Sequence, residues 1–317
     1  MTVHDTIENA AAIIRKGGLV AIPTETVYGL AADATNDRAV ARIFEAKGRP
    51  QFNPLIMHVA NIEMAAQYVH FPPLAEKLAK AFWPGALTLV LPRREDCAAS
   101  LLVSAGLDTI AIRMPNHKIA QDLIKAVDRP LAAPSANKSG SLSPTLPEHV
   151  RDSLGYKVDM ILDGGACSIG IESTIIKIDG DSAVMLRPGG ITCEEIKSVM
   201  GMPLSTTPSA GAQPEAPGML PSHYAPRASI RLNVVTPKPD EAYLALGHAQ
   251  VNTPYRLNLS ESGDLCEAAA NLFAHMRALD DICSAHNLSG IAASPIPMDG
   301  LGEAINDRLT RAAAPRP

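Results

Sequence analysis

Short apolar runs alternate with amphipathic segments along the first 200 residues. The first run, 19–22, is stopped by Pro23, and a second run occupies 55–59. Between them lie a hydroxyl-rich loop, 24–33, and a segment of helical period that ends in Lys47-Gly48-Arg49-Pro50. Strand, loop, helix and strand in this order indicate an α/β unit, in which ligands collect at the carboxyl ends of the strands.

The same pattern extends to residue 200. The segment 109–115 alternates most clearly, which predicts that Ile110 and Ile112 face the core while Thr109 and Arg113 lie on the other face. We expect helices over 3–16, 36–47, 61–69, 73–82, 117–126 and 192–200, and strands over 19–22, 55–59, 86–91, 109–115, 131–133, 160–162, 175–178 and 184–187.

The pattern stops at residue 201 and resumes near 229. Residues 201–228 show no period and contain six prolines, which predicts a semi-stiff linker. Beyond it we expect strands over 230–235, 255–259 and 290–293 and helices over 238–247, 263–285 and 300–312. The predicted organisation is an α/β domain (1–200), a Pro-rich linker (201–228) and a smaller α/β domain with a parallel sheet (229–317).

Composition narrows the class of protein. A length of 317 residues favours two domains, and a net charge of −5 argues against a chain-wide grip on nucleic acid. The five cysteines form no CxxC pair, which favours reduced thiols over disulfides or a zinc site. Neither a signal peptide nor an apolar run near the ~18 residues of a membrane span is visible. We therefore expect a cytoplasmic protein without membrane contact.

Four cations stand at or near predicted strand ends and form the candidate chemistry. They are Lys47, Arg49, Arg113 and Arg187. The chain lacks a P-loop, a GxGxxG turn, a GxSxG elbow and an HExxH helix. Cations and hydroxyl-rich loops without a nucleophile suit phosphoryl or nucleotidyl transfer, whose catalysis is mostly alignment and electrostatics. The residues alone thus indicate a nucleotide-using enzyme without a P-loop.

Other interpretations of these side chains stay open at this point. Lys47 also suits a helix C-terminus without any ligand, because a cation there is favoured by the helix dipole. Arg113 also suits a plain ion pair with a neighbouring carboxylate. A single strand histidine such as His58 is more often structural than functional.

Five ordered motifs resemble the YrdC-like threonylcarbamoyl-AMP synthase family. They are Pro23-Thr24-Glu25-Thr26-Val27-Tyr28-Gly29-Leu30, Lys47-Gly48-Arg49-Pro50, Asn53-Pro54-Leu55-Ile56-Met57-His58, Pro134-Ser135-Ala136-Asn137 and Glu172-Ser173-Thr174. Two later segments, His223-Tyr224-Ala225-Pro226 and 300–308, look like the long two-domain form of that family. The resemblance implies a YrdC-like twisted, open mixed sheet with helices, followed by a smaller Rossmann-like α/β domain.

The resemblance also implies an activity and a map of the site. The enzyme would make threonylcarbamoyl-AMP and diphosphate from L-threonine, bicarbonate or CO₂, and ATP with Mg²⁺ held through the ATP phosphates. A threonylcarbamoyltransferase complex would then use the product to modify tRNA beside the anticodon. Lys47 and Arg49 would offset the developing negative charge. Threonine would contact Thr26, His58, Arg113, the Ala133 backbone and Ser173, and ATP would contact Arg49, Asn53, Thr109, Ser135, Ser143, Arg187 and Tyr224.

Two alternative functions remain at the level of sequence. A double-stranded RNA-binding module would use the same cationic face without turnover, although the net charge and the 4% aromatic content speak against it. A carbamoyl-adenylate-forming maturation enzyme shares the resembling core, but this chain lacks the CxxC zinc motifs of those large proteins. We expect no stable nucleic-acid binding.

Overall fold

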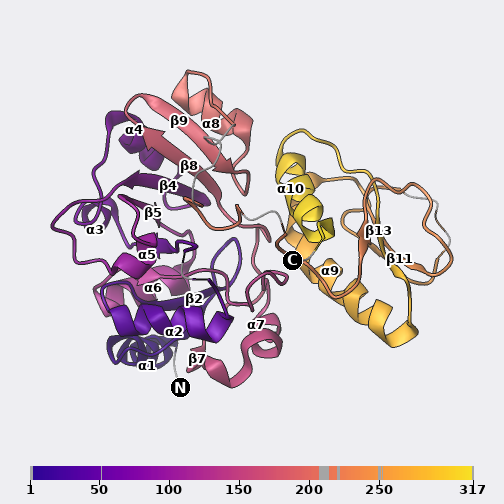
Figure 1. Ribbon diagram of the computed structural model, residues 1–317, viewed down its shortest axis with the longest axis horizontal. Helices are drawn as coiled ribbons and strands as arrows, with labels where there is room; N and C mark the ends of the chain where they lie inside the picture. Colours follow the sequence, from indigo (N-terminus) through magenta and orange to yellow (C-terminus); the bar gives the residue numbers. More distant parts are fainter. Residues whose placement is uncertain are drawn as a thin grey trace.

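The computed structural model describes residues 3–50, 52–206, 214–219, 222–248, 251 and 253–315. Within them a large mixed sheet and a smaller α/β domain lie side by side (Figure 1). The strands of the large sheet are β1 (Val20–Ile22), β2 (Gly29–Asp33), β3 (Ile56–His58), β4 (Leu87–Pro92), β5 (Thr109–Arg113), β6 (Leu131–Ala132), β7 (Met160–Ile161), β8 (Thr174–Asp179) and β9 (Ser182–Arg187). Their spatial order is β7-β1-β2-β6-β3-β5-β4-β8-β9, with parallel and antiparallel pairs mixed.

Helices cover both faces of this sheet. They are α1 (Val3–Arg15), α2 (Asp37–Lys47), α3 (Ile62–Ala65), α4 (Pro73–Phe82), α5 (Leu101–Ser104), α6 (Lys118–Val127), α7 (Pro147–Leu154) and α8 (Cys193–Met200), with a 3₁₀ turn at Gly155–Lys157. One face packs against α2, α4 and α8, and the other packs against α1 and α6. Ile110 and Ile112 belong to the first core and Ala111 to the opposite face, so the predicted faces of this strand are confirmed.

Part of the second face is covered by the linker rather than by a helix. Ile56, Ala111 and Ile175 form an apolar patch there, and Ala216 and Met219 of the linker pack on it. Of the predicted linker, residues 207–213 and 220–221 lie outside the described residues. The described part therefore lies against the sheet instead of spanning open solvent.

Local signals explain where α2 begins and ends. The side chain of Asn36 accepts hydrogen bonds from the backbone N–H groups of Arg38 and Ala39, as an N-cap does. Gly48 closes the helix in the left-handed conformation, with φ of 60°. Arg49 follows directly after this turn, outside the helix, and its side chain is buried.

The smaller domain has a four-stranded sheet whose neighbours all run parallel, as predicted. Its strands are β10 (Ile230–Arg231), β11 (Glu241–Ala245), β12 (Arg256–Asn258) and β13 (Gly290–Ala293), in the order β10-β13-β11-β12. The helices α9 (Leu265–His286) and α10 (Leu301–Ala313) lie on the side that faces the larger domain (Figure 1).

One predicted element is wrong in type and three were missed. The helix expected over 238–247 is the strand β11, because its residues are buried between β13 and β12, where a continuous apolar run mimics a helix. The strand β2 lies inside the predicted loop 24–33, and α5 and α7 were not foreseen. The predicted strand over 230–235 is shorter, since β10 ends at Arg231. Among the described residues, no helix combines the length and apolarity needed to cross a membrane.

Candidate active site

A single pocket collects most of the predicted site residues at one edge of the large sheet. The strands β3, β5 and β9 end there, and β8 begins there. Side chains from segments far apart in the sequence therefore meet at this place. The cavity volume of the pocket is only about 40 Å³, and Pro217, Gly218, His223 and Tyr224 of the linker form part of its wall. The predicted residues that line it are Thr26, Arg49, His58, Arg113, Ala133, Ser135, Ser173, Arg187 and Tyr224.

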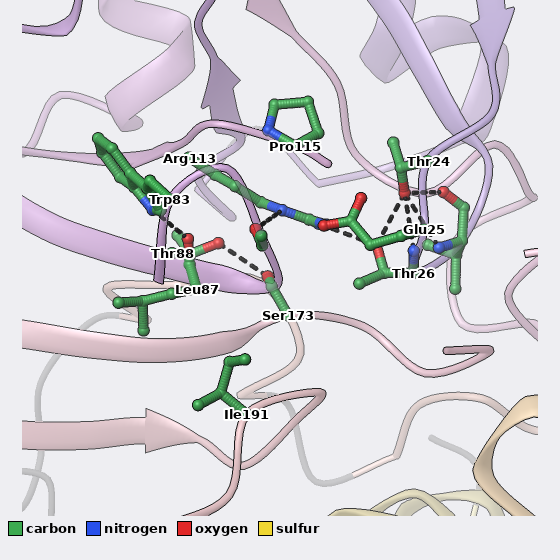
Figure 2. A network of polar contacts seen from close by, with 12 residues as sticks. Thr24, Glu25, Thr26, Trp83, Leu87, Thr88, Arg113, Pro115, Ser173 and Ile191 are labelled. Carbon is green, nitrogen blue, oxygen red and sulfur yellow. Dashed lines mark hydrogen bonds and ion pairs between the residues drawn. The ribbon is translucent and has the colours of Figure 1, made fainter. Parts of the chain in front are cut away.

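Arg113 is fixed at the end of β5 by three partners. Its Nε donates to the Gly85 carbonyl at 3.0 Å, and its Nη1 donates to the Thr26 hydroxyl at 2.9 Å. Its Nη2 lies 2.6 Å from Oε1 of Glu25, and both side chains are buried. Figure 2 shows the guanidinium reaching toward Glu25 and Thr26. The ion-pair interpretation of Arg113 is therefore confirmed, and a role toward a ligand has to coexist with it.

Two neighbours of Arg113 offer neutral polar groups. Burial, aided by the charge of Arg113, lowers the pKa of His58 to about 3, so the imidazole is neutral at physiological pH. Its Nδ1 lies 3.3 Å from the Ile56 carbonyl, which can only accept, so Nε2 remains an acceptor. The hydroxyl of Ser173 is held 2.7 Å from that of Thr88 (Figure 2).

The other end of the pocket carries cations without an equal number of carboxylates. Arg49 donates from Nη2 to the Pro54 carbonyl at 2.9 Å, and Arg187 donates from Nη2 to the Ser173 carbonyl at 2.9 Å. Burial and the repulsion from Arg187 lower the pKa of Arg49 to about 10, so it stays charged at pH 7. Two buried guanidinium groups at one end of a pocket favour an anion such as a phosphate chain.

Four predicted residues do not line the pocket. The ammonium of Lys47 lies behind the 134–137 loop and donates to the carbonyls of Ser135 and Asn137, each at 2.5 Å. Burial lowers the pKa of Lys47 well below its ordinary value. Asn53 is buried beside Arg49, whose Nε donates to its carbonyl at 3.3 Å. Thr109 stands at the far end of β5 from Arg113, and Ser143 is fully buried behind Glu172.

Sequence reasoning assigned no role to three residues that build this pocket. Glu172 and His223 line it, and Arg308 of α10 lies directly behind Glu172 with its Nε 2.7 Å from Oε2. Arg308 is completely buried, and its guanidinium carbon lies 5.2 Å from the centre of the Tyr224 ring. All three lie in sequence motifs named above, at 172–174, 223–226 and 300–308. A motif shows which residues stand together in the sequence, but it does not show which side chains meet in space.

The charges divide the pocket into two unlike ends. At one end Arg113 is balanced by Glu25, and at the other Glu172 is balanced by Arg308, which leaves Arg49 and Arg187 in excess. No cluster of three or more His, Cys, Asp or Glu side chains suited to a metal occurs among the described residues. These charges suit a zwitterion or a carboxylate at the first end and a polyanion at the second.

Known proteins resemble this chain over nearly its whole length. A family profile described as "Telomere recombination" matches residues 12–189, and one described as "Threonylcarbamoyl-AMP synthase, C-terminal domain" matches residues 191–314. Threonylcarbamoyl-AMP synthases of Bacillus subtilis and Pyrococcus abyssi are each 41% identical and cover 98% of this chain, which spans 93% and 94% of theirs. The crystal structure of the Pyrococcus abyssi Sua5 protein complexed with L-threonine covers 97% of this chain and 94% of its own, with a TM-score of 0.87. These matches favour neither the RNA-binding module nor the maturation enzyme.

Proposed function

The chain belongs to the threonylcarbamoyl-AMP synthase family, and from this membership we propose that it converts L-threonine, bicarbonate and ATP into L-threonylcarbamoyl-AMP and diphosphate. One observation carries the proposal beyond the family name. One pocket has a neutral end, formed by Arg113 and Glu25, and a cationic end, formed by Arg49 and Arg187. Such a pocket suits an amino acid lying beside a nucleoside triphosphate.

The residues support a division of labour within the reaction. The threonine carboxylate would lie on Arg113, next to Thr26 and Ser173, while neutral His58 offers an acceptor to the substrate amine or hydroxyl. Bicarbonate and the threonine amine condense to a carbamate with loss of water. A carbamate oxygen then attacks the α-phosphorus of ATP and expels diphosphate. Arg49 and Arg187 would offset the negative charge that builds up on the phosphates.

Mg²⁺ fits this pocket through ATP rather than through the protein. The two carboxylates near the cavity, Glu25 and Glu172, are each paired with an arginine, and the described residues contain no group of three or more His, Cys, Asp or Glu side chains that could hold a metal. The ion would therefore be held by phosphate oxygens and water, where it withdraws charge from the leaving diphosphate. Arg49 and Arg187 would orient the same phosphates from the protein side.

The linker is proposed to act as a lid. A cavity of about 40 Å³ holds a few water molecules and not ATP, so Pro217, Gly218 and Tyr224 have to move for the nucleotide to enter. Closure afterwards would exclude water from the mixed anhydride product. The product would pass to a tRNA-modifying threonylcarbamoyltransferase complex in the cytoplasm, a compartment that suits the five free cysteines.

The experiment that tests the proposal measures diphosphate release from ATP with threonine and bicarbonate added singly and together. Release that needs both, together with a threonine-bearing AMP adduct in mass spectrometry, is the expected result. Release with bicarbonate and a different amine would change the substrate. Absence of release under every combination would reject the activity.

A further inference from the structure

Glu25 is a buried carboxylate in the pocket wall that the proposed reaction does not use. It follows β1 in the loop before β2, its side chain is 7% exposed, and it does not line the cavity. Its Oε1 lies 2.6 Å from Nη2 of Arg113, whose side chain does line the cavity. A carboxylate in this place costs desolvation, so its presence calls for a role.

The guanidinium keeps donors for a ligand in spite of this ion pair. Arginine has five N–H groups. Within the described residues, one faces the Gly85 carbonyl, one the Thr26 hydroxyl and one Glu25. One N–H on each terminal nitrogen remains, so each of these nitrogens can still donate to a ligand oxygen.

The neighbours of the pair add no net charge. His58 has a pKa of about 3 because of burial, and burial also lowers the pKa of His117, so both imidazoles are neutral at pH 7. Burial raises the pKa of Glu25, but the charge of Arg113 outweighs it and holds the value below the ordinary one, so this carboxyl is ionised. The Arg113–Glu25 end of the pocket is thus neutral before any ligand arrives.

We propose that Glu25 makes this end of the pocket selective for zwitterionic α-amino acids over plain carboxylates. A plain carboxylate on Arg113 would place a second anion on one buried guanidinium and leave the cluster with a net negative charge. An amino acid brings its own ammonium and keeps the cluster neutral. The inference rests on the proposed function, because it assumes that the threonine carboxylate lies on Arg113.

Selectivity of this kind has a use in the reaction. Bicarbonate is itself a small anion and a second substrate, and an uncompensated Arg113 would bind it in place of threonine. Glu25 acts through Arg113 and touches no reacting atom, so it is a positioning and specificity residue. Its loss should change which ligands bind more than how fast a bound complex reacts.

The test compares the dissociation constants of two ligands by isothermal titration calorimetry. The ligands are L-threonine and the 2,3-dihydroxy acid of the same configuration, in which a hydroxyl replaces the ammonium. We expect the wild-type protein to bind the hydroxy acid at least about tenfold more weakly, since juxtaposed like charges disfavour binding. In Glu25→Gln, which keeps an acceptor for Nη2, the ratio of the two constants should fall toward one, while Glu25→Asp should keep the ratio.

Glu148→Gln, on an exposed carboxylate of α7, is the matched control and should leave the ratio unchanged. A ratio near one in the wild-type protein overturns the inference without any variant, so the test does not depend on the folding of Glu25→Gln, which removes a buried counter-ion. An unchanged ratio in a folded Glu25→Gln protein overturns it as well. Failure of the wild-type protein to bind threonine at all would instead count against the proposed function.

Discussion

At the scale of single residues, Arg49 is the side chain on which the proposed chemistry depends most. We expect Arg49→Ala to lower diphosphate release by about 10²–10³-fold, the usual cost of removing one preorganised group that stabilises a transition state. The fold should survive, because within the described residues the side-chain hydrogen bonds of Arg49 go to two backbone carbonyls nearby in the sequence. The control is Arg151→Ala, whose side chain is 61% exposed on α7. Near-normal activity of Arg49→Ala with intact circular dichroism would refute the role.

We expect the contribution of Arg308 to the free energy of unfolding to depend on pH, through its ion pair with Glu172. Burial raises the pKa of Glu172, but the charges of Arg308 and Arg187 outweigh it and bring the value to about 2. The stabilising contribution of Glu172 is therefore fully present above the unfolded pKa near 4.5 and is lost as the pH falls toward 2. Arg308→Met should cost about 3–5 kcal/mol at pH 7, because it leaves a buried carboxylate without its partner.

Urea unfolding at several pH values checks this prediction. The difference in unfolding free energy between wild type and Arg308→Met should be largest at pH 7 and shrink as the pH falls below 4.5. Lys118→Met, in an exposed pair with Asp122, should have almost no effect at any pH. A difference that stays constant down to about pH 3, well inside the window between the two pKa values, would show that the loss comes from packing rather than from the ion pair.

The residues that the sequence could and could not reveal differ in one respect. The hydroxyls and cations of short motifs, such as Thr26 and Arg49, could be selected from the sequence because each lies in a contiguous motif, and both line the pocket. Glu172 and Arg308 are 136 positions apart, and nothing local in either motif indicates that they touch. Lys47 lies in an equally clear motif, but the structure places its side chain outside the pocket. Its Nζ donates to the carbonyls of Ser135 and Asn137 instead.

At the scale of elements, the linker is the segment to which we assign the opening and closing of the pocket, because Pro217, Gly218 and Tyr224 line it. Gly218 has φ of +85°, and a Cβ there would lie 2.8 Å from Oη of Tyr224 and 3.1 Å from Cδ of Arg187. The Pro217 carbonyl accepts a hydrogen bond from Nη1 of Arg187 at 3.2 Å. The closed linker thus fits around the two side chains that we assign to ATP.

Gly218→Ala should therefore hinder closure. We expect diphosphate release to fall by up to about 10²-fold, since small misplacements of positioning groups have effects of this size. Gly201→Ala is the matched control, because Gly201 has φ of +71° but a Cβ added there would meet no described atom within 4 Å. It should lose only about 1–2 kcal/mol of stability from the left-handed backbone. Equal activity of the two variants in a steady-state assay would reject the fit of the closed linker.

Elements with a clear period were predictable, and short buried ones were not. The alternation of 109–115 identified β5 and its faces, and the caps of α2 marked its ends. In β11 the run Ala242–Ala245 is buried on both sides, so period carries no information and tertiary pairing decides the type. β2 is rich in glycine and alanine, residues with weak strand propensity, and it exists because it pairs with β1 and β6.

At the scale of the whole molecule, the smaller domain contacts the loops that form the pocket wall. Its α9 donates from Arg277 Nη2 to the Leu142 carbonyl at 3.0 Å, and its α10 pairs Arg308 with Glu172. Leu142 and Ile171, from the two loops beside the pocket, belong to the core of the smaller domain. The position of these loops therefore depends on how closely the two domains pack.

Gly170 packs directly against the backbone of α9 and gives a sharp test of this dependence. A Cβ at Gly170 would lie 2.4 Å from the Cα of Ala270 in α9, so even alanine has to push the helix or the loop away. We expect Gly170→Ala to lose about 1–3 kcal/mol more than a positive φ alone explains, because overpacking adds to the strain. Activity should fall too, since Glu172 and Ser173 lie on the displaced loop. Gly180→Ala, with φ of +57° and open space around it, separates the two effects. If Gly170→Ala matched that control in thermal unfolding and in diphosphate release, the smaller domain would not be positioning the pocket.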